Sequence, residues 1–231
     1  MITVKKSQSL DASIRHILPL ITTTIQLCIE ENNEIRIALA GGNTPKPLYR
    51  ALKKENLEWD KVYITLTDER WVSTADDNSN EKMIKEFFID QLHSSPQFIP
   101  LKNNSSSATL GMAECHSTLE KSLPNLDLII LGMGEDGHFA SIFPGVDNLD
   151  ALLDQQNSLN CMAVTPLGKE ERISLTLKYL LTAKMIILFI TGDEKKSVIE
   201  SVLAGNQESS QYPITHIIQQ NICPVHIYWN P

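Results

Sequence analysis

The sequence predicts a doubly wound α/β fold, in which helices cover both faces of a mainly parallel sheet. Short apolar runs alternate with helical patterns from one end of the 231-residue chain to the other. The runs are rich in Ile, Leu and Val and are apolar on both sides, which is typical of parallel strands buried on both faces. Alternation of this kind favours strand–helix–strand units. No composition shift divides the chain, so we expect a single domain over residues 1–231.

The expected elements follow one another in chain order. Strands are predicted at 2–5, 35–40, 62–66, 126–131, 161–165, 185–191 and 225–229. The first helix is predicted from the spacing of apolar residues between Ile14 and Cys28, with a kink at Pro19. A second helix is predicted over 45–55, with Asn43 or Thr44 as its N-cap. Further helices are predicted from 78–81 onward, over 110–123 and over 194–204.

Composition and charge exclude several classes of function. Apolar residues make up 42% of the chain and charged residues 21%, which suits a folded domain with a sizeable core. The formal net charge of −8 argues against binding to nucleic acid, whose phosphates it would repel. A small anionic substrate would need a local pocket of Arg, Lys and backbone N–H groups.

The cysteines and the apolar runs indicate the compartment. Four widely spaced cysteines show no zinc-ligand spacing, and we expect them to be free thiols. No apolar run reaches the roughly 18 residues of a membrane span, and no secretory signal opens the chain. We therefore expect a cytoplasmic protein with no membrane partner, as a monomer or weak homodimer.

Residues 132–137, Gly-Met-Gly-Glu-Asp-Gly, match the G-x-G-x-x-G dinucleotide fingerprint after an apolar run. The rest of the fingerprint is missing. Only six residues separate the third glycine from Pro144, too few for the long helix that a dinucleotide site needs. The carboxylates of Glu135 and Asp136 would also face the pyrophosphate. We therefore expect no dinucleotide cofactor.

The same loop presents Asp136 and His138, a carboxylate and an imidazole two residues apart. Ligands of open α/β sheets bind outside the carboxyl ends of the strands, where this loop is expected. Histidine titrates near neutral pH and is the natural general base, and a neighbouring carboxylate can orient it. His138 is therefore a candidate catalytic base.

Other loops bring polar residues to the same edge. Gly41, Gly42, Asn43 and Thr44 follow one predicted strand and precede a helix, which is typical of an anion site. In the second unit, Asp68 and Arg70 directly follow a strand. Arg172 and Lys195 are further cations near strand ends.

Taken together, these segments resemble the 6-phosphogluconolactonase family. The segments are LAGGNTPKPLYRAL, TDERWV, LIILGMGEDGHFASIFPG, RISLTL and FITGDEKK, in family order over about residues 35–205. The resemblance implies a Rossmann-like fold and metal-free hydrolysis of 6-phospho-D-glucono-1,5-lactone, without a cofactor, in the oxidative pentose phosphate pathway. It implies His138 as general base and substrate binding by residues 41–44, Arg70, Arg172 and Lys195. Asn43, Glu135 and Phe139 depart from the residues common in the family.

The orientation of the base and the activity each leave alternatives open. Either Asp136 or Asp68 could orient His138. Glucosamine-6-phosphate deaminases share the fold and the Asp-Gly-His motif, but this chain has Ser-Ile-Phe-Pro at 141–144 where they have Asn-Glu-Pro. A non-catalytic sugar-phosphate sensor is the third possibility, although no DNA-binding helix–turn–helix accompanies the domain.

Overall fold

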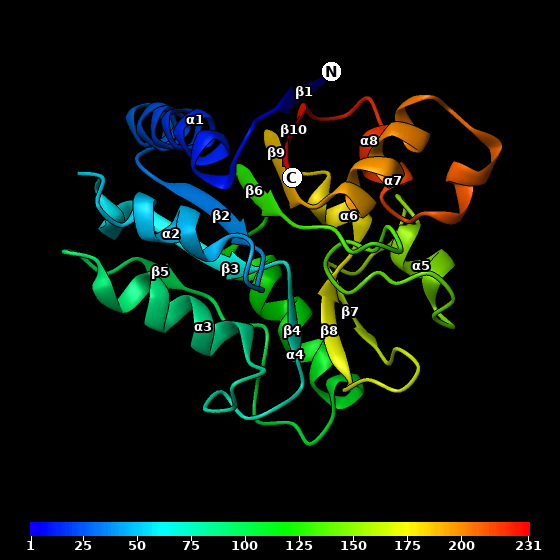
Figure 1. The fold of residues 1–231 in the computed structure, drawn as a ribbon. Coiled ribbons are helices and arrows are strands. Elements are labelled where there is room, and N and C mark those ends of the chain that lie inside the picture. Colours follow the sequence, from blue (N-terminus) through cyan, green and yellow to red (C-terminus); the bar gives the residue numbers. More distant parts are fainter.

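Seven parallel strands form the central sheet of the computed structural model, which describes residues 1–231 apart from the side chain of Glu208 (Figure 1). In sheet order they are β1 (Ile2–Lys6), β10 (Val225–Asn230), β9 (Met185–Thr191), β6 (Leu128–Leu131), β2 (Ile35–Leu39), β3 (Val62–Leu66) and β5 (Gln97–Phe98). The predicted doubly wound α/β fold is confirmed. The two-residue strand β5 was not predicted from the sequence.

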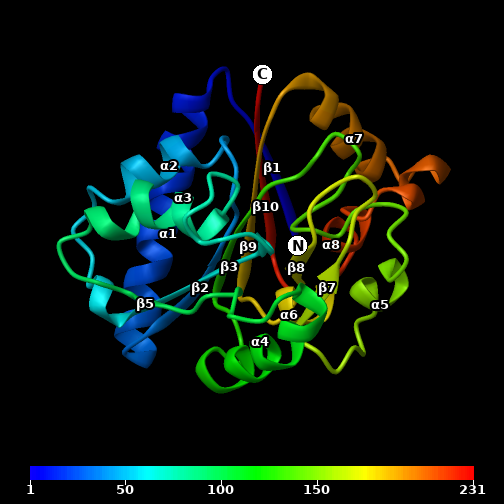
Figure 2. The same cartoon turned by 90° about the horizontal axis from the view of Figure 1, so that it is seen from below.

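Helices cover both faces of this sheet. Figure 2 shows the sheet edge-on, with α1, α2 and α3 on one side and α7 and α8 on the other. The helices are α1 (Leu10–Asn32), α2 (Lys46–Leu52), α3 (Asn80–Phe87), α4 (Ala108–Ser122), α5 (Leu149–Leu153), α6 (Leu177–Leu180), α7 (Asp193–Leu203) and α8 (Thr215–Ile218), with short 3-10 turns at Trp59–Lys61, Ile89–Gln91 and Gln207–Gln211. The four cysteines are free and buried, as expected.

Helix α1 is long and apolar enough to cross a membrane by length and composition, which the sequence reading did not anticipate. In this fold it is a core helix: Ile17, Ile21 and Ile25 are fully buried, whereas Leu27 on another face is exposed. One buried stripe is what a helix packed on a sheet requires. The helix runs through Pro19 without being divided.

A second, antiparallel sheet of three strands lies beside the first. Its order is β4 (Asp68–Arg70), β8 (Arg172–Leu175) and β7 (Cys161–Val164). The expectation that the strand at 161–165 belongs to the parallel sheet is therefore wrong. The short loop at 165–171, rather than a crossover helix, joins β7 to β8, and a connection this short reaches only an antiparallel neighbour.

The order of the strands locates a crevice. From β2 the chain moves outward through β3 to β5, whereas from β6 it moves the opposite way through β9 to β10. The loops that follow β2 and β6 therefore diverge at the boundary between these two neighbouring strands. Such a switch point is where open α/β sheets bind their ligands.

Candidate active site

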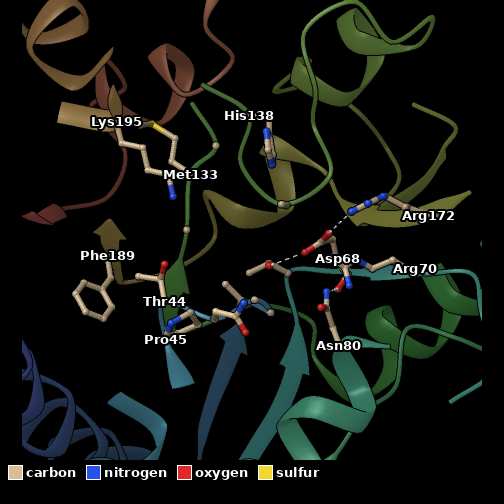
Figure 3. A pocket seen from close by; sticks show the side chains of 18 residues that line it. Thr44, Pro45, Asp68, Arg70, Asn80, Met133, His138, Arg172, Phe189 and Lys195 are labelled. Atoms are coloured by element: carbon tan, nitrogen blue, oxygen red, sulfur yellow. Dashed lines mark hydrogen bonds and ion pairs between the residues drawn. The ribbon is translucent and has the colours of Figure 1, made fainter. Parts of the chain in front are cut away.

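A pocket of about 300 Å³ opens at this switch point (Figure 3). Nine of the ten residues singled out in the sequence line it, on five separate segments. They are Gly41, Gly42, Asn43, Thr44, Asp68, Arg70, His138, Arg172 and Lys195. The tenth, Asp136, contacts His138 directly. Residues up to 154 positions apart in the chain are thus brought to one cavity.

The loop after β6 presents His138 at the wall of the pocket. The Nδ1 atom of His138 lies 2.5 Å from Oδ1 of Asp136, and the backbone N–H of His138 donates to the same oxygen at 3.1 Å. A Cβ on Gly134 would lie 2.1 Å from Cε1 of His138, so only glycine leaves room for the imidazole here. The neighbouring Glu135 is exposed. Asp136 holds Nδ1, which leaves Nε2 as the ring nitrogen available to a substrate.

Burial and the mutual contact act in opposite directions on the pKa values of His138 and Asp136. Burial lowers the pKa of His138 below its ordinary value, and the hydrogen bond and charge of Asp136 oppose this only in part. Burial disfavours the Asp136 carboxylate, yet its contacts with His138 outweigh that effect and lower the pKa of Asp136. Ionised Asp136 can only accept a hydrogen bond, so His138 carries its proton on Nδ1 and has a lone pair on Nε2.

The Asp68 carboxylate makes a different set of contacts. Its Oδ2 accepts a hydrogen bond from Ser141 Oγ at 2.6 Å and lies 3.8 Å from a terminal nitrogen of Arg172. Its Oδ1 accepts from Thr67 Oγ1 at 3.2 Å. Of the two carboxylates considered for orienting His138, Asp136 is therefore the one in contact. Asp68 instead holds the guanidinium of Arg172 at the pocket wall.

Three cations face the pocket from different elements. Arg70 lies at the end of β4, Arg172 begins β8 and Lys195 lies in the first turn of α7. Figure 3 shows both arginines beside Asp68 and Lys195 on the other side of the cavity. The Nε atoms of Arg70 and Arg172 are buried and have no hydrogen-bond partner among the described residues. Buried charged donors without partners are costly, so these two groups favour a bound anion.

The glycine loop after β2 forms the floor of the pocket. Helix α2 begins with Pro45 as its N-cap and no side-chain cap, so the predicted cap at Asn43 or Thr44 is wrong. The Asn43 side chain instead accepts a hydrogen bond from Nζ of Lys46 at 2.9 Å. The φ angle of Gly42 is +91°, a conformation that glycine adopts without strain.

Sequence reasoning missed several polar residues that support the site. Asn80 lines the pocket, donates to the carbonyl of Asp68 at 2.9 Å and lies directly against Gly41. The signal for Asn80 was present in the Ser-Asn pair at 79–80, which indicated a helix start. Ser141 follows the Asp-Gly-His motif on the same loop as His138, but its partner Asp68 is 73 residues away. Contacts between residues so far apart in the chain cannot be predicted from residue spacing.

Glu69 was also missed, although it is buried and organises the same corner. Its carboxylate accepts the backbone N–H groups of Asn80 and Glu81 at 2.7 Å each, the N–H of Arg70 at 2.8 Å and the hydroxyl of Ser79 at 3.0 Å. Burial raises the pKa of Glu69, although these four hydrogen bonds act in the opposite direction. The contacts tie the start of α3 to β4 and thereby help to fix the backbone at Arg70.

Comparison with known proteins places these features in a family. The family described as glucosamine-6-phosphate isomerases/6-phosphogluconolactonase matches residues 8–229. A 6-phosphogluconolactonase of Rhizobium meliloti (strain 1021) is 33% identical over 196 residues, or 84% of each chain. One of Caulobacter vibrioides is 31% identical over 222 residues, covering 95% of this chain and 91% of the relative.

Solved structures agree with the sequence comparison. The crystal structure of a 6-phosphogluconolactonase from Shewanella baltica OS155 superposes with a TM-score of 0.93 at 30% identity, over 100% of this chain and 98% of that one. A monomeric glucosamine-6-phosphate deaminase superposes with a TM-score of 0.81 at 21% identity, which shows a shared fold alone. The resemblance seen in the sequence is confirmed, and the chain belongs to the glucosamine-6-phosphate isomerase/6-phosphogluconolactonase family.

Proposed function

We propose that this chain hydrolyses 6-phospho-D-glucono-1,5-lactone to 6-phosphogluconate, with His138 as the general base. The observation that carries the proposal is the His138–Asp136 pair, which faces a pocket that also holds Arg70, Arg172 and Lys195. A neutral imidazole beside an anion-binding wall is what lactone opening on a phosphorylated sugar requires. Relatives about 30% identical over most of the chain carry the name 6-phosphogluconolactonase.

In the proposed reaction, Nε2 of His138 takes a proton from a water molecule as that water attacks the lactone carbonyl carbon. Asp136 accepts the Nδ1 hydrogen bond and stabilises the imidazolium that forms. The carbonyl oxygen gains negative charge, which cations or backbone N–H groups at the pocket wall stabilise. The intermediate then collapses, the carbon–ring-oxygen bond breaks, and the imidazolium or water protonates the departing oxygen. General-base catalysis of this kind contributes about 10²–10⁴ in rate.

The phosphate of the substrate fits the cationic part of the pocket. Residues 41–44 offer backbone N–H groups and the hydroxyl of Thr44, and the buried Nε atoms of Arg70 and Arg172 lack partners among the described residues. We propose that these groups and Lys195 divide two tasks, namely holding the phosphate and stabilising the oxyanion. The reaction needs no metal or cofactor, because the base and the positive charge are both supplied by side chains.

We also propose that the chain forms one domain and acts in the cytoplasm as a monomer or weak homodimer, without nucleic acid or membrane partners. Four buried free thiols suit a reducing compartment, and the net charge of −8 disfavours nucleic acid.

A lactonase assay in the presence of EDTA, corrected for spontaneous lactone opening, tests the proposal. Wild-type turnover should survive EDTA, and His138→Ala should lose about 10²–10⁴ in kcat while keeping its circular dichroism spectrum. Near wild-type turnover in His138→Ala would refute the role of the base. Release of ammonia from glucosamine 6-phosphate would instead support a deaminase, and binding of 6-phosphogluconate without lactone turnover would support a sensor.

A further inference from the structure

Lys169 lies outside the motifs that mark the site, yet its side chain contacts Phe143, whose ring contacts the base. It closes the β7–β8 turn, a β-turn over residues 166–169 within the loop that joins these strands. Its N–H donates to the carbonyl of Pro166 at 3.1 Å, and Gly168 has a φ of +70°. Its Nζ lies 4.4 Å from the ring centroid of Phe143, although the residue is exposed. An ammonium at this distance from an aromatic ring makes a cation–π contact.

The ring of Phe143 also contacts the base itself. Its centroid lies 4.1 Å from that of His138, with the two planes 31° apart. The guanidinium carbon of Arg172 lies 5.3 Å from the same centroid. Phe143 is buried, so its position is fixed by packing. One ring therefore joins Lys169 on the β7–β8 turn to His138 on the loop after β6.

The charges around His138 act in opposite directions. Burial is the main cause that lowers the pKa of His138, Asp136 and Asp68 act to raise it, and the charge of Lys169 adds to the lowering. The contacts through Phe143 place the ammonium within about 9 Å of the imidazole, where charges still interact appreciably at low salt. Arg172 is paired with Asp68, so its charge is partly offset. Lys195 lines the same pocket from α7.

We propose that Lys169 is a positioning residue of the active site, which packs on Phe143 next to His138 and helps to keep the imidazole in its neutral, proton-accepting form. The proposal rests on the general-base role given to His138 above. It gives the β7–β8 turn a function in the chemistry. A cation there opposes the two carboxylates, so that Asp136 orients the imidazole through Nδ1 while Nε2 stays unprotonated. Because Lys169 is exposed, its effect depends on ionic strength.

The test is an NMR titration of the His138 imidazole together with the pH profile of kcat/KM, for wild type, Lys169→Gln and Lys169→Arg. Comparison with His138→Gln assigns the resonance. In Lys169→Gln the midpoint should move to higher pH, and kcat/KM at pH 5.5 and low salt should fall about two- to fourfold, with little change at pH 8. Both effects should shrink in 0.5 M NaCl, and Lys169→Arg should behave as wild type.

Two controls separate this role from a general loss of charge or structure. Lys121→Gln removes one positive charge from an exposed site near the end of α4, and Leu167→Gln alters the fully exposed tip of the same turn. Both should leave the midpoint unchanged. An unchanged midpoint in Lys169→Gln, or the same shift in Lys121→Gln, would overturn the proposal. The titration needs no turnover, so it decides the role of Lys169 even if the lactonase assay fails.

Discussion

Exchanging Asp136 for Asn tests whether a negative charge stabilises His138 when the imidazole takes a proton. The change is conservative in shape. Oδ1 of Asp136 accepts the backbone N–H of His138 at 3.1 Å, and the amide oxygen of Asn can accept the same bond. The turn that displays the imidazole is therefore kept, and the unfolding free energy should change by less than about 1 kcal/mol, as at most exposed positions.

The expected cost follows from the contact at 2.5 Å between Nδ1 of His138 and Oδ1 of Asp136. A hydrogen bond to a charged group contributes about 1.5–3 kcal/mol, and one between neutral groups about 0.5–1.5 kcal/mol. The Asp136 side chain is 46% exposed, so solvent screening brings the difference to the lower end of that range. Removing the charge should therefore cost about 1 kcal/mol in the transition state, or about fivefold in kcat.

The pH profile gives a second, signed prediction for the same variant. Asp136 raises the pKa of His138 against the lowering effect of burial, so its neutralisation should lower that pKa further. The active form is the neutral imidazole, which exists above the pKa. The acid limb of kcat/KM should therefore move to lower pH, and the defect relative to wild type should narrow as the pH falls.

The assay is lactone hydrolysis from pH 5 to 8, corrected for spontaneous opening, with circular dichroism as a control for folding. Unchanged kcat would show that the carboxylate does not act on the transition state. An acid limb that moves to higher pH would refute the electrostatic account.

Three further exchanges probe other parts of the site. Gly134→Ala should reduce kcat by about 10²-fold or more in the lactonase assay, because the alanine Cβ would displace the His138 ring. The folding stability should change little. Normal turnover in this variant would contradict the prediction. Glu69→Gln should lower the melting temperature by a few degrees, because an amide cannot accept all four buried hydrogen bonds. Each buried donor left without a partner costs about 1–3 kcal/mol of folding free energy. An unchanged melting temperature would count against this prediction. Arg172→Gln should raise KM for the lactone about tenfold or more with a smaller effect on kcat, whereas an unchanged KM would exclude Arg172 from phosphate binding.

The sequence predicted the parallel sheet well because its inner strands are buried on both faces, which leaves a continuous apolar run in the chain. The run at 161–164 looks the same but lies in the small antiparallel sheet. An apolar run indicates a strand but does not show with which strand it pairs. The sequence predicts no strand at β4 or β8, because Asp68–Arg70 is wholly charged and β8 opens with an arginine.

The same distinction separates the predictable and unpredictable parts of the site. Asp136 and His138 are two residues apart, so their pairing follows from local loop geometry. The contact between Ser141 and Asp68 joins loops 73 residues apart, and Lys169 reaches His138 only through Phe143. Each of these contacts depends on how two loops meet above the sheet, which residue spacing does not encode.

The glycine pattern at 132–137 shows why a fingerprint needs its context. In a dinucleotide site the backbone N–H groups of this turn are free to face a pyrophosphate. Here the N–H of Gly134 donates to the carbonyl of His138 at 2.9 Å, and that of Gly137 donates to the carbonyl of Gly134 at 3.1 Å. The turn closes on itself, and the space left by the missing Cβ of Gly134 is filled by the imidazole and by the Asp136 carboxylate. The glycines thus give close approach to a side chain of the same loop, so the pattern that suggests a cofactor instead sets the position of a base.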